Sequence, residues 1–234
     1  MPEIKTINDH PFIHYSRETY PENIMKERSA DFFSWMNKRR TCRDFSDRPV
    51  AKEIIENLVL TASSAPSGAH KQPWTFCIVS NQEIKKQIRM AAEKEEKESY
   101  NGRMSKDWLK DLAPIGTDWQ KPFLETAPWL IIVFKRSYEF STPSVTDLET
   151  ATKHQNYYVT ESVGLACGFL LAAIHHAGLV ALTHTPSPMN FLINILQRPN
   201  NEKPFLLIPV GYAAEDCWVP NLKRKELDEV AVFY

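Results

Sequence analysis

Three arginines lie within five residues of one another in this chain: Arg39, Arg40 and Arg43. Only Asp44 and Asp47 are near enough in the sequence to neutralise them. A guanidinium binds phosphate through two parallel hydrogen bonds, so a cluster of this kind suits a phosphate-bearing ligand. A solvated basic helix end is the alternative interpretation, and the residues alone leave both open.

A second candidate site is the segment from Ala65 to His70, which reads Ala-Pro-Ser-Gly-Ala-His. It follows an expected helix and leads into an aromatic strand that starts at Trp74. A chain that stops a helix and turns through Pro and Gly leaves backbone N–H groups exposed beside a rigid wall, which suits a planar ligand. A plain connector is the alternative.

Glu96 and Tyr100 are four residues apart, so they share one face of an expected helix. Lys121 follows further along the chain. A carboxylate, a phenol and an ammonium could together bind both charges of a zwitterion. In isolation the same residues are also what a solvated charged helix carries.

The sequence Thr183-His184-Thr185 follows an expected strand. Side chains at the carboxyl ends of strands commonly face ligands in α/β proteins. The Thr185 hydroxyl could donate a hydrogen bond there, and His184 could titrate near neutral pH. A purely structural histidine is the alternative.

Composition excludes several classes of protein. Only 7 of the 234 residues are glycine, and neither G-x-G-x-x-G nor G-x-x-x-x-G-K-[ST] occurs, so arginine side chains would have to hold a phosphate. A net charge of −1 favours neither nucleic acid nor a membrane surface as a partner. The histidine and cysteine spacings match no metal site. Four cysteines without a signal-peptide core predict reduced thiols and a cytoplasmic location.

Helical and strand-like segments alternate, which predicts an α/β or α+β protein with one core. We expect an N-terminal arm at 1–25 and a single domain at 26–234. The expected helices are at 26–39, 51–62, 82–100, 106–112, 118–125, 155–177 and 189–196, and the expected strands at 74–80, 129–135, 179–183 and 205–211. We interpret residues 138–154 as a surface loop.

The helix expected at 155–177 is apolar nearly all round, which indicates a buried central helix or a subunit interface. Gly164, Gly168 and Ala172 give it a face of small residues that would permit close approach of another helix.

Together these segments resemble the iodotyrosine deiodinase branch of the FMN-dependent nitroreductase superfamily. The resemblance is carried by RRTCRDFS, TASSAPSGAHKQPWTF, EKEEKESYNGRM, TDWQKPFLETAPWLI, ESVGLACGFLLAAIHHAGLVALTHTP, RPNNEKPFLLIPVGY and VPNLKRK. It implies an α+β, nitroreductase-like FMN-binding fold with a central mixed sheet flanked by helices. It also implies a domain-swapped homodimer with FMN sites at the interface.

The resemblance assigns roles to residues of both kinds of site. The cofactor-binding residues it implies are Arg39, Arg40, Thr41, Arg43 and Arg224, then Pro66, Ser67 and Gly68 from the partner subunit, and Thr183, His184 and Thr185 along the isoalloxazine. Thr185 would be the catalytic residue, with its hydroxyl near flavin N5. The Ala69 N–H would hold the substrate phenolate. Glu96, Tyr100 and Lys121 would bind the zwitterion from a lid at about 90–125.

The implied activity is FMN-dependent reductive dehalogenation of 3-halotyrosines (iodo-, bromo- or chlorotyrosine) to tyrosine and halide. Electrons would come from a reductase or from NAD(P)H. A general NAD(P)H-dependent nitroreductase or quinone reductase is the alternative, and a flavin-binding protein without turnover is a third. Glu96, Tyr100 and Lys121 favour the first, because nitroaromatics offer no zwitterion. No nucleic acid and no membrane is expected as a partner.

Overall fold

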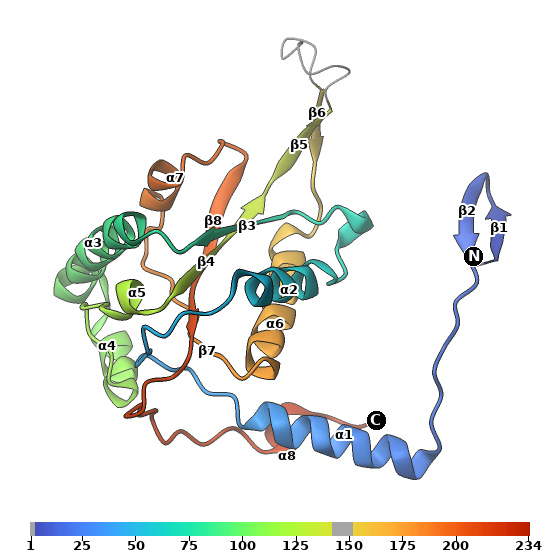
Figure 1. Ribbon diagram of the computed structural model, residues 1–234, viewed down its shortest axis with the longest axis horizontal. Helices are drawn as coiled ribbons and strands as arrows, with labels where there is room; N and C mark the ends of the chain where they lie inside the picture. Colours follow the sequence, from blue (N-terminus) through green and yellow to red (C-terminus); the bar gives the residue numbers. More distant parts are fainter. Residues whose placement is uncertain (1–2, 142–151) are drawn as a thin grey trace. The chain divides into compact units, whose positions relative to one another are not determined.

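The computed structural model describes residues 3–141 and 152–234, and the chain divides into two compact units at Arg39 and Arg40 (Figure 1). The first unit contains the hairpin of β1 (Ile4–Ile7) and β2 (His10–Ile13), followed by helix α1 (Glu22–Asn37). The hairpin lies within the segment that we expected to be an arm. Helix α1 begins at Glu22 rather than at the predicted Lys26, because Pro21 already has a φ of −55° and its carbonyl accepts the first hydrogen bond of the helix.

The second unit is built on a four-stranded sheet in the order β3-β4-β8-β7, with every neighbouring pair antiparallel. The strands are β3 (Trp74–Val79), β4 (Trp129–Arg136), β7 (Val180–Ala181) and β8 (Glu202–Gly211). The α+β class is thus confirmed. The sequence predicted a mixed sheet. Among the described residues, the one parallel pairing is the isolated bridge between Thr41 and Ala181.

Helices cover both faces of this sheet (Figure 1). On one face are α2 (Lys52–Ser63) and α6 (Val159–His176), and on the other are α3 (Gln82–Glu98), α5 (Phe123–Thr126) and α7 (Phe191–Ile195). The unit also contains α4 (Lys106–Leu112), α8 (Leu227–Val230) and the short turns η1 (Gly68–His70), η2 (Ser99–Arg103) and η3 (Ala113–Ile115).

Strand β4 is apolar from Trp129 to Phe134, and its residues 130–134 are buried on both faces of the sheet. Its side chains alternate between two cores. Ile131 and Val133 pack in the core with α2 and α6, whereas Leu130, Ile132 and Phe134 pack in the core with α3, α5 and α7. The sheet therefore separates the helix pair α2 and α6 from α3, which carries Glu96, and from α5, which follows the loop that carries Lys121.

Three sequence-based expectations for this unit are corrected. The predicted helix at 118–125 is reduced to α5, because a residue before proline avoids helical backbone angles and Pro122 follows Lys121. The helix predicted from Gln155 begins at Val159, since Tyr158 has a φ of +48°. The predicted loop at 138–154 has strands at its ends, β5 (Tyr138–Ser141) and β6 (Thr152–Gln155), which pair with each other. Its middle, 142–151, lies outside the described residues.

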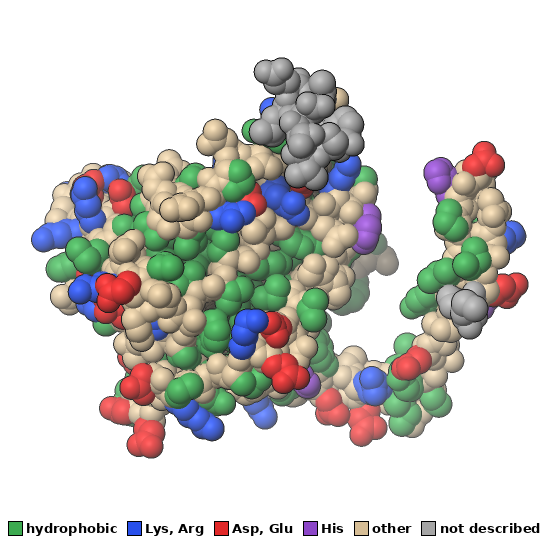
Figure 2. Space-filling model, turned by 45° about the horizontal axis from the view of Figure 1, so that its top comes forward, with side chains coloured by type: hydrophobic (Ala, Val, Ile, Leu, Met, Phe, Trp, Pro, Cys, Tyr) green, Lys and Arg blue, Asp and Glu red, His purple; other side chains and the backbone are tan. Residues whose placement is uncertain are grey.

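Helix α6 is buried on one side only. Gly164, Leu165, Gly168 and Phe169 are exposed, with Leu165 at 49% and Phe169 at 41%. Exposed hydrophobic side chains also gather across the middle of this unit in Figure 2. By length and composition α6 is the single described helix apolar enough to cross a membrane, a property that core helices of soluble proteins share. The exposed apolar side is consistent with the interface that the sequence predicted as one possibility.

Candidate functional site

The structure brings Glu96, Tyr100 and Lys121 together at the end of α3. The Glu96 carboxylate lies 3.5 Å from the Lys121 ammonium, and the two side chains are only 10% and 3% exposed. The Lys121 ammonium also lies 5.7 Å from the centre of the Tyr100 ring. A turn separates Glu96 from Tyr100, so the helix presents both to the loop that carries Lys121.

The loop before α5 wraps around the Lys121 ammonium. The Thr117 hydroxyl accepts a hydrogen bond from Lys121 Nζ at 3.3 Å, and the Asp118 carbonyl accepts another. The Thr117 carbonyl accepts from the Tyr100 hydroxyl at 3.1 Å. Sequence reasoning missed Thr117, because a backbone carbonyl and a hydroxyl in an irregular loop leave no periodic signal.

Burial works against both charges of the pair. It raises the pKa of the Glu96 carboxyl, although the nearby Lys121 ammonium partly opposes the rise. It lowers the pKa of Lys121, an effect that Glu96 partly offsets. Neither group is therefore fully stabilised by the other, and each can gain from a further charged partner.

Arg43 and His184 belong to the same neighbourhood. Burial lowers the pKa of Arg43, while the Tyr100 and Asp44 side chains act in the opposite direction. The pKa of His184 is lowered to about 3, chiefly by burial and further by the positive charges of Lys121 and Arg43. His184 is therefore a neutral imidazole at physiological pH.

One ring nitrogen of His184 is buried without a partner. Its Nε2 has no hydrogen-bond partner among residues 3–141 and 152–234. The imidazole ring packs edge-on against the ring of Phe123, with the two ring centres 5.7 Å apart. A buried polar atom without a partner is costly, so it marks a position where a ligand can supply the missing hydrogen bond. Sequence reasoning singled out His184 but not Phe123.

Strand β7 lies beside the arginine cluster at residues 39–43, and Thr183 and Thr185 follow this strand in the chain. Thr41 pairs with Ala181, and the Cys42 N–H donates to the Ala181 carbonyl at 3.3 Å. Two residues beyond Ala181 the chain alternates, with Thr183 and Thr185 exposed and His184 buried between them. The two threonine side chains thus share a side, opposite to that of His184.

The other arginines predicted to bind a phosphate are Arg39, Arg40 and Arg224. The Arg40 guanidinium donates to the carbonyl of Pro220, which ties it to the C-terminal segment that carries the exposed Arg224. Arg39 is the last residue of the first unit, and Arg40 is the first of the second.

The predicted Pro66 to Ala69 segment forms a strained turn. Ala69, His70 and Gln72 have φ values of +49°, +54° and +46°, a conformation that non-glycine residues rarely adopt. The Gln72 N–H donates to Ser67 Oγ at 2.9 Å, but the Ala69 N–H has no acceptor in the part of the chain that the structure describes. Clustered strain of this kind is typical of ligand-binding segments.

Gly68 allows this turn to lie against the start of α6. Its N–H donates to Ser162 Oγ at 3.2 Å, and a Cβ at this position would lie 2.9 Å from the Tyr157 carbonyl oxygen. The turn thus packs with α6, on the face of the sheet opposite to α3. Within one chain the structure does not bring the Pro66–Ala69 turn and the Glu96–Lys121 pair to a common site.

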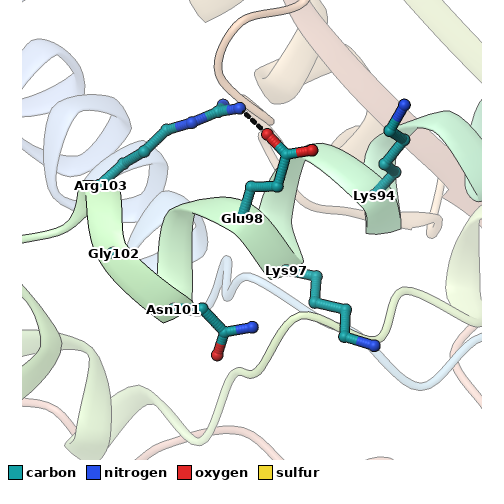
Figure 3. Close-up of a pocket in the computed structure, with 6 residues that line it drawn as sticks. All are labelled: Lys94, Lys97, Glu98, Asn101, Gly102 and Arg103. Atoms are coloured by element: carbon teal, nitrogen blue, oxygen red, sulfur yellow. Dashed lines mark hydrogen bonds and ion pairs between the residues drawn. The ribbon is translucent and has the colours of Figure 1, made fainter.

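A surface pocket lies on the outer side of α3 and η2 (Figure 3). Its lining residues are Lys94, Lys97, Glu98, Asn101, Gly102 and Arg103, and Arg103 is paired with Glu98. None of the predicted site residues lines this pocket. Among the described residues no three His, Cys, Asp or Glu side chains are placed to hold a metal ion.

Comparison with known proteins agrees with this fold. The model of the nitroreductase family matches residues 36–212, so the chain belongs to the nitroreductase family. A relative from Haliscomenobacter hydrossis named iodotyrosine deiodinase is 61% identical over 223 residues, which are 95% of this chain and 97% of the relative. Human iodotyrosine deiodinase 1 is 42% identical over 94% of this chain and 74% of its own length.

The solved structures that resemble this chain include an iodotyrosine deiodinase and a nitroreductase. A crystal structure of oxidized iodotyrosine deiodinase bound to FMN and 3-iodo-L-tyrosine matches with a TM-score of 0.70 and 31% identity, over 87% of this chain and 98% of that one. A Bacteroides fragilis nitroreductase with bound FMN has 16% identity and a TM-score of 0.61 over 87% and 99% of the two chains, and this likeness shows the fold alone. The nitroreductase-like fold expected from the sequence is confirmed.

Proposed function

We propose that this chain is an FMN-dependent oxidoreductase that removes the halogen of 3-halotyrosines and yields tyrosine and halide. The observation that carries the proposal is the buried Glu96–Lys121 pair beside Tyr100. An amino acid offers an ammonium to the carboxylate and a carboxylate to the ammonium and the phenol. The relative of 31% identity that binds 3-iodo-L-tyrosine and FMN supports this assignment.

The residues present fit FMN. The buried Nε2 of His184 lacks a partner among the described atoms, and Arg43 brings positive charge into the same neighbourhood. We assign Arg39, Arg40, Thr41, Arg43 and Arg224 to the phosphate and ring, and Thr183, His184 and Thr185 to the isoalloxazine. Bound FMN in its reduced form supplies the two electrons of the reaction.

The protein's own contribution is position and charge. Glu96 accepts hydrogen bonds from the substrate ammonium, while Lys121 and Tyr100 donate to its carboxylate. The Ala69 N–H donates to the phenolate oxygen, and the Thr185 hydroxyl donates toward the flavin. The carbon–halogen bond is broken, the halogen leaves as halide, and the ring carbon gains one hydrogen, so two electrons and one proton are consumed. Binding energy from the remote zwitterion is thus spent on alignment at the reacting carbon.

A homodimer would complete this site. The Pro66–Ala69 turn and the Glu96–Lys121 pair lie on opposite faces of the sheet in one chain, so we assign Pro66, Ser67 and Gly68 to the FMN site of a second copy. The exposed face of α6 is the proposed interface, and the exposed apolar C-terminal residues, such as Val232 and Phe233, would be exchanged between copies. Gly168→Arg, on this face, is expected to yield monomers without FMN in sedimentation and absorbance measurements, whereas Gly102→Arg, which lies on η2, is expected to leave the dimer intact.

The electron donor and the location are further parts of the proposal. We propose that a reductase or NAD(P)H reduces the flavin and that the protein is cytoplasmic, where the four cysteines, which form no disulfide within the described residues, would stay reduced. Flavin reduction followed by absorbance, with NADPH or NADH alone and then with added reductase, separates the two donors.

The deciding experiment is anaerobic. The purified holoenzyme is reduced with dithionite and mixed with 3-iodo-L-tyrosine, and iodide and tyrosine are measured. Release of about one iodide per reduced flavin is expected from the two-electron balance. Absence of iodide together with efficient NADPH-dependent turnover of nitroaromatics would instead identify a general nitroreductase.

A further inference from the structure

Helix α3 carries a polar stripe that extends away from Glu96 toward the start of the helix. Lys85, Arg89 and Glu93 are four residues apart and therefore share one face. All three are hydrogen-bonded to the segment 121–127, which contains Lys121 and α5. The same face of the helix thus contributes Glu96 to the site and also contacts the segment that provides its Lys121.

Lys85 binds the far end of this segment. Its side chain is buried, with the residue only 1% exposed, and its ammonium donates to the carbonyls of Glu125 at 2.8 Å and Ala127 at 2.7 Å. These carbonyls lie at the end of α5, where helix carbonyls lack partners within the helix. The end of the segment is therefore fixed to α3.

Glu93 binds the near end, at Lys121 itself. Its Oε1 accepts hydrogen bonds from the Lys121 backbone N–H at 2.7 Å and from Arg89 Nε at 2.7 Å. Arg89 also reaches Glu125 at 3.4 Å. Arg89 therefore orients the carboxylate, and the carboxylate holds the backbone from which the Lys121 side chain extends.

We propose that Glu93 is a positioning residue for substrate recognition, which it serves by holding the Lys121 backbone so that the ammonium stays beside Glu96. The proposal rests on the function proposed above. A lysine side chain has four rotatable bonds. Each rotation that is lost when the substrate binds costs conformational entropy and so reduces the affinity. A fixed backbone confines the ammonium, whereas a free loop would let it turn to solvent, where its charge is better hydrated.

The test is a double-mutant cycle in the holoenzyme. The Kd of 3-iodo-L-tyrosine is measured by quenching of bound-FMN fluorescence for the wild type, Glu93→Ala, Lys121→Met and the double variant. Glu93→Ala is expected to raise the Kd about tenfold, the size of one hydrogen bond to a charged group. In the Lys121→Met background the same change is expected to have little effect, because Glu93 acts through Lys121. An equal loss in both backgrounds would overturn the proposal.

Two further variants separate positioning from folding. Glu93→Gln keeps a carbonyl that can accept from the Lys121 N–H, so it is expected to retain most of the affinity even if Glu93→Ala proves unstable. A loss as large as that of Glu93→Ala would contradict the backbone hydrogen bond as the cause. Glu83→Gln, at an exposed position on the same helix, is the matched control and is expected to bind normally. Failure of the wild type to bind iodotyrosine would refute the proposed function itself, before any variant is compared.

Discussion

The Glu96 carboxylate and the Lys121 ammonium lie 3.5 Å apart, in a place where burial opposes the charge of each. A buried ion pair gains little net stability, because the loss of hydration offsets the attraction between its charges. A zwitterionic substrate brings two opposite charges into the same place without changing the net charge. The pair is thus placed to stabilise an amino acid more than it stabilises the empty protein.

Glu96→Gln is expected to weaken binding of 3-iodo-L-tyrosine by about 2 kcal/mol, a factor of about 30, because the substrate ammonium loses its charged acceptor. FMN content is expected to stay at the wild-type level. Fluorescence titration gives the affinity, and absorbance of the released flavin gives the content. Glu98→Gln is the matched control, since this carboxylate is half-exposed and pairs with Arg103. Loss of FMN from Glu96→Gln would refute the assignment of Glu96 to the substrate.

Thr185→Ala is expected to retain FMN and to shift the activity from dehalogenation toward nitro reduction. We propose that the hydrogen bond from the Thr185 hydroxyl to the flavin supports dehalogenation, and that nitro reduction does not require it. Iodide release and nitroaromatic turnover are measured with the same preparation. Thr61→Ala, on α2, removes an exposed hydroxyl that bonds only within its helix and should change neither rate. A parallel fall of both rates in Thr185→Ala would contradict this role.

His184 is expected to make the protein sensitive to acid. Its pKa is about 3 in the folded protein, against an ordinary value of 6.5, so between these values the unfolded chain binds a proton that the folded protein does not. The contribution of His184 to the free energy of unfolding is fully present above pH 6.5. Below pH 6.5 the free energy of unfolding falls by about 1.4 kcal/mol for each pH unit. Urea unfolding between pH 7 and pH 4 measures the slope. His184→Gln cannot titrate and should show a shallower decline; equal slopes would contradict the buried neutral imidazole.

Arg136 is expected to hold the strained turn that carries Ala69. Its guanidinium donates to the carbonyls of Gln72 at 3.0 Å and Trp74 at 3.2 Å, and it pairs with Glu139 at 3.0 Å. Arg136→Gln should lower the free energy of unfolding by about 2 kcal/mol, because hydrogen bonds to a charged group are lost.

Two measurements check the role of Arg136. Urea unfolding gives the stability, and amide hydrogen exchange should become faster at residues 69–74 than elsewhere. Lys203→Gln removes an exposed charge from the same sheet and serves as the control. A uniform increase in exchange over the whole chain would indicate general destabilisation and not release of the turn.

Local patterns were sufficient for most helices and strands. The continuous apolar run of β4 and the helical spacing on α2 and α3 are properties of short segments, so the sequence predicts them to within a few residues. The errors lie where tertiary contacts override local preference. Residues 118–122 were expected to be helical but wrap around the Lys121 ammonium, and residues 138–141 pair with 152–155 although neither segment has a clear strand pattern.

The sequence by itself determined the residue types of the site. The spacing of Glu96 and Tyr100 places them on one helix face, and the glycine shortage excludes the two glycine-rich phosphate loops, so that any phosphate would have to be held by side chains such as those of the arginine cluster. Only the tertiary structure decided that Lys121 lies against Glu96, that His184 is buried with an unpartnered nitrogen, and that Glu93 holds the Lys121 backbone. Burial and the closure of a loop around a charge depend on residues far apart in the chain, and no local pattern records them.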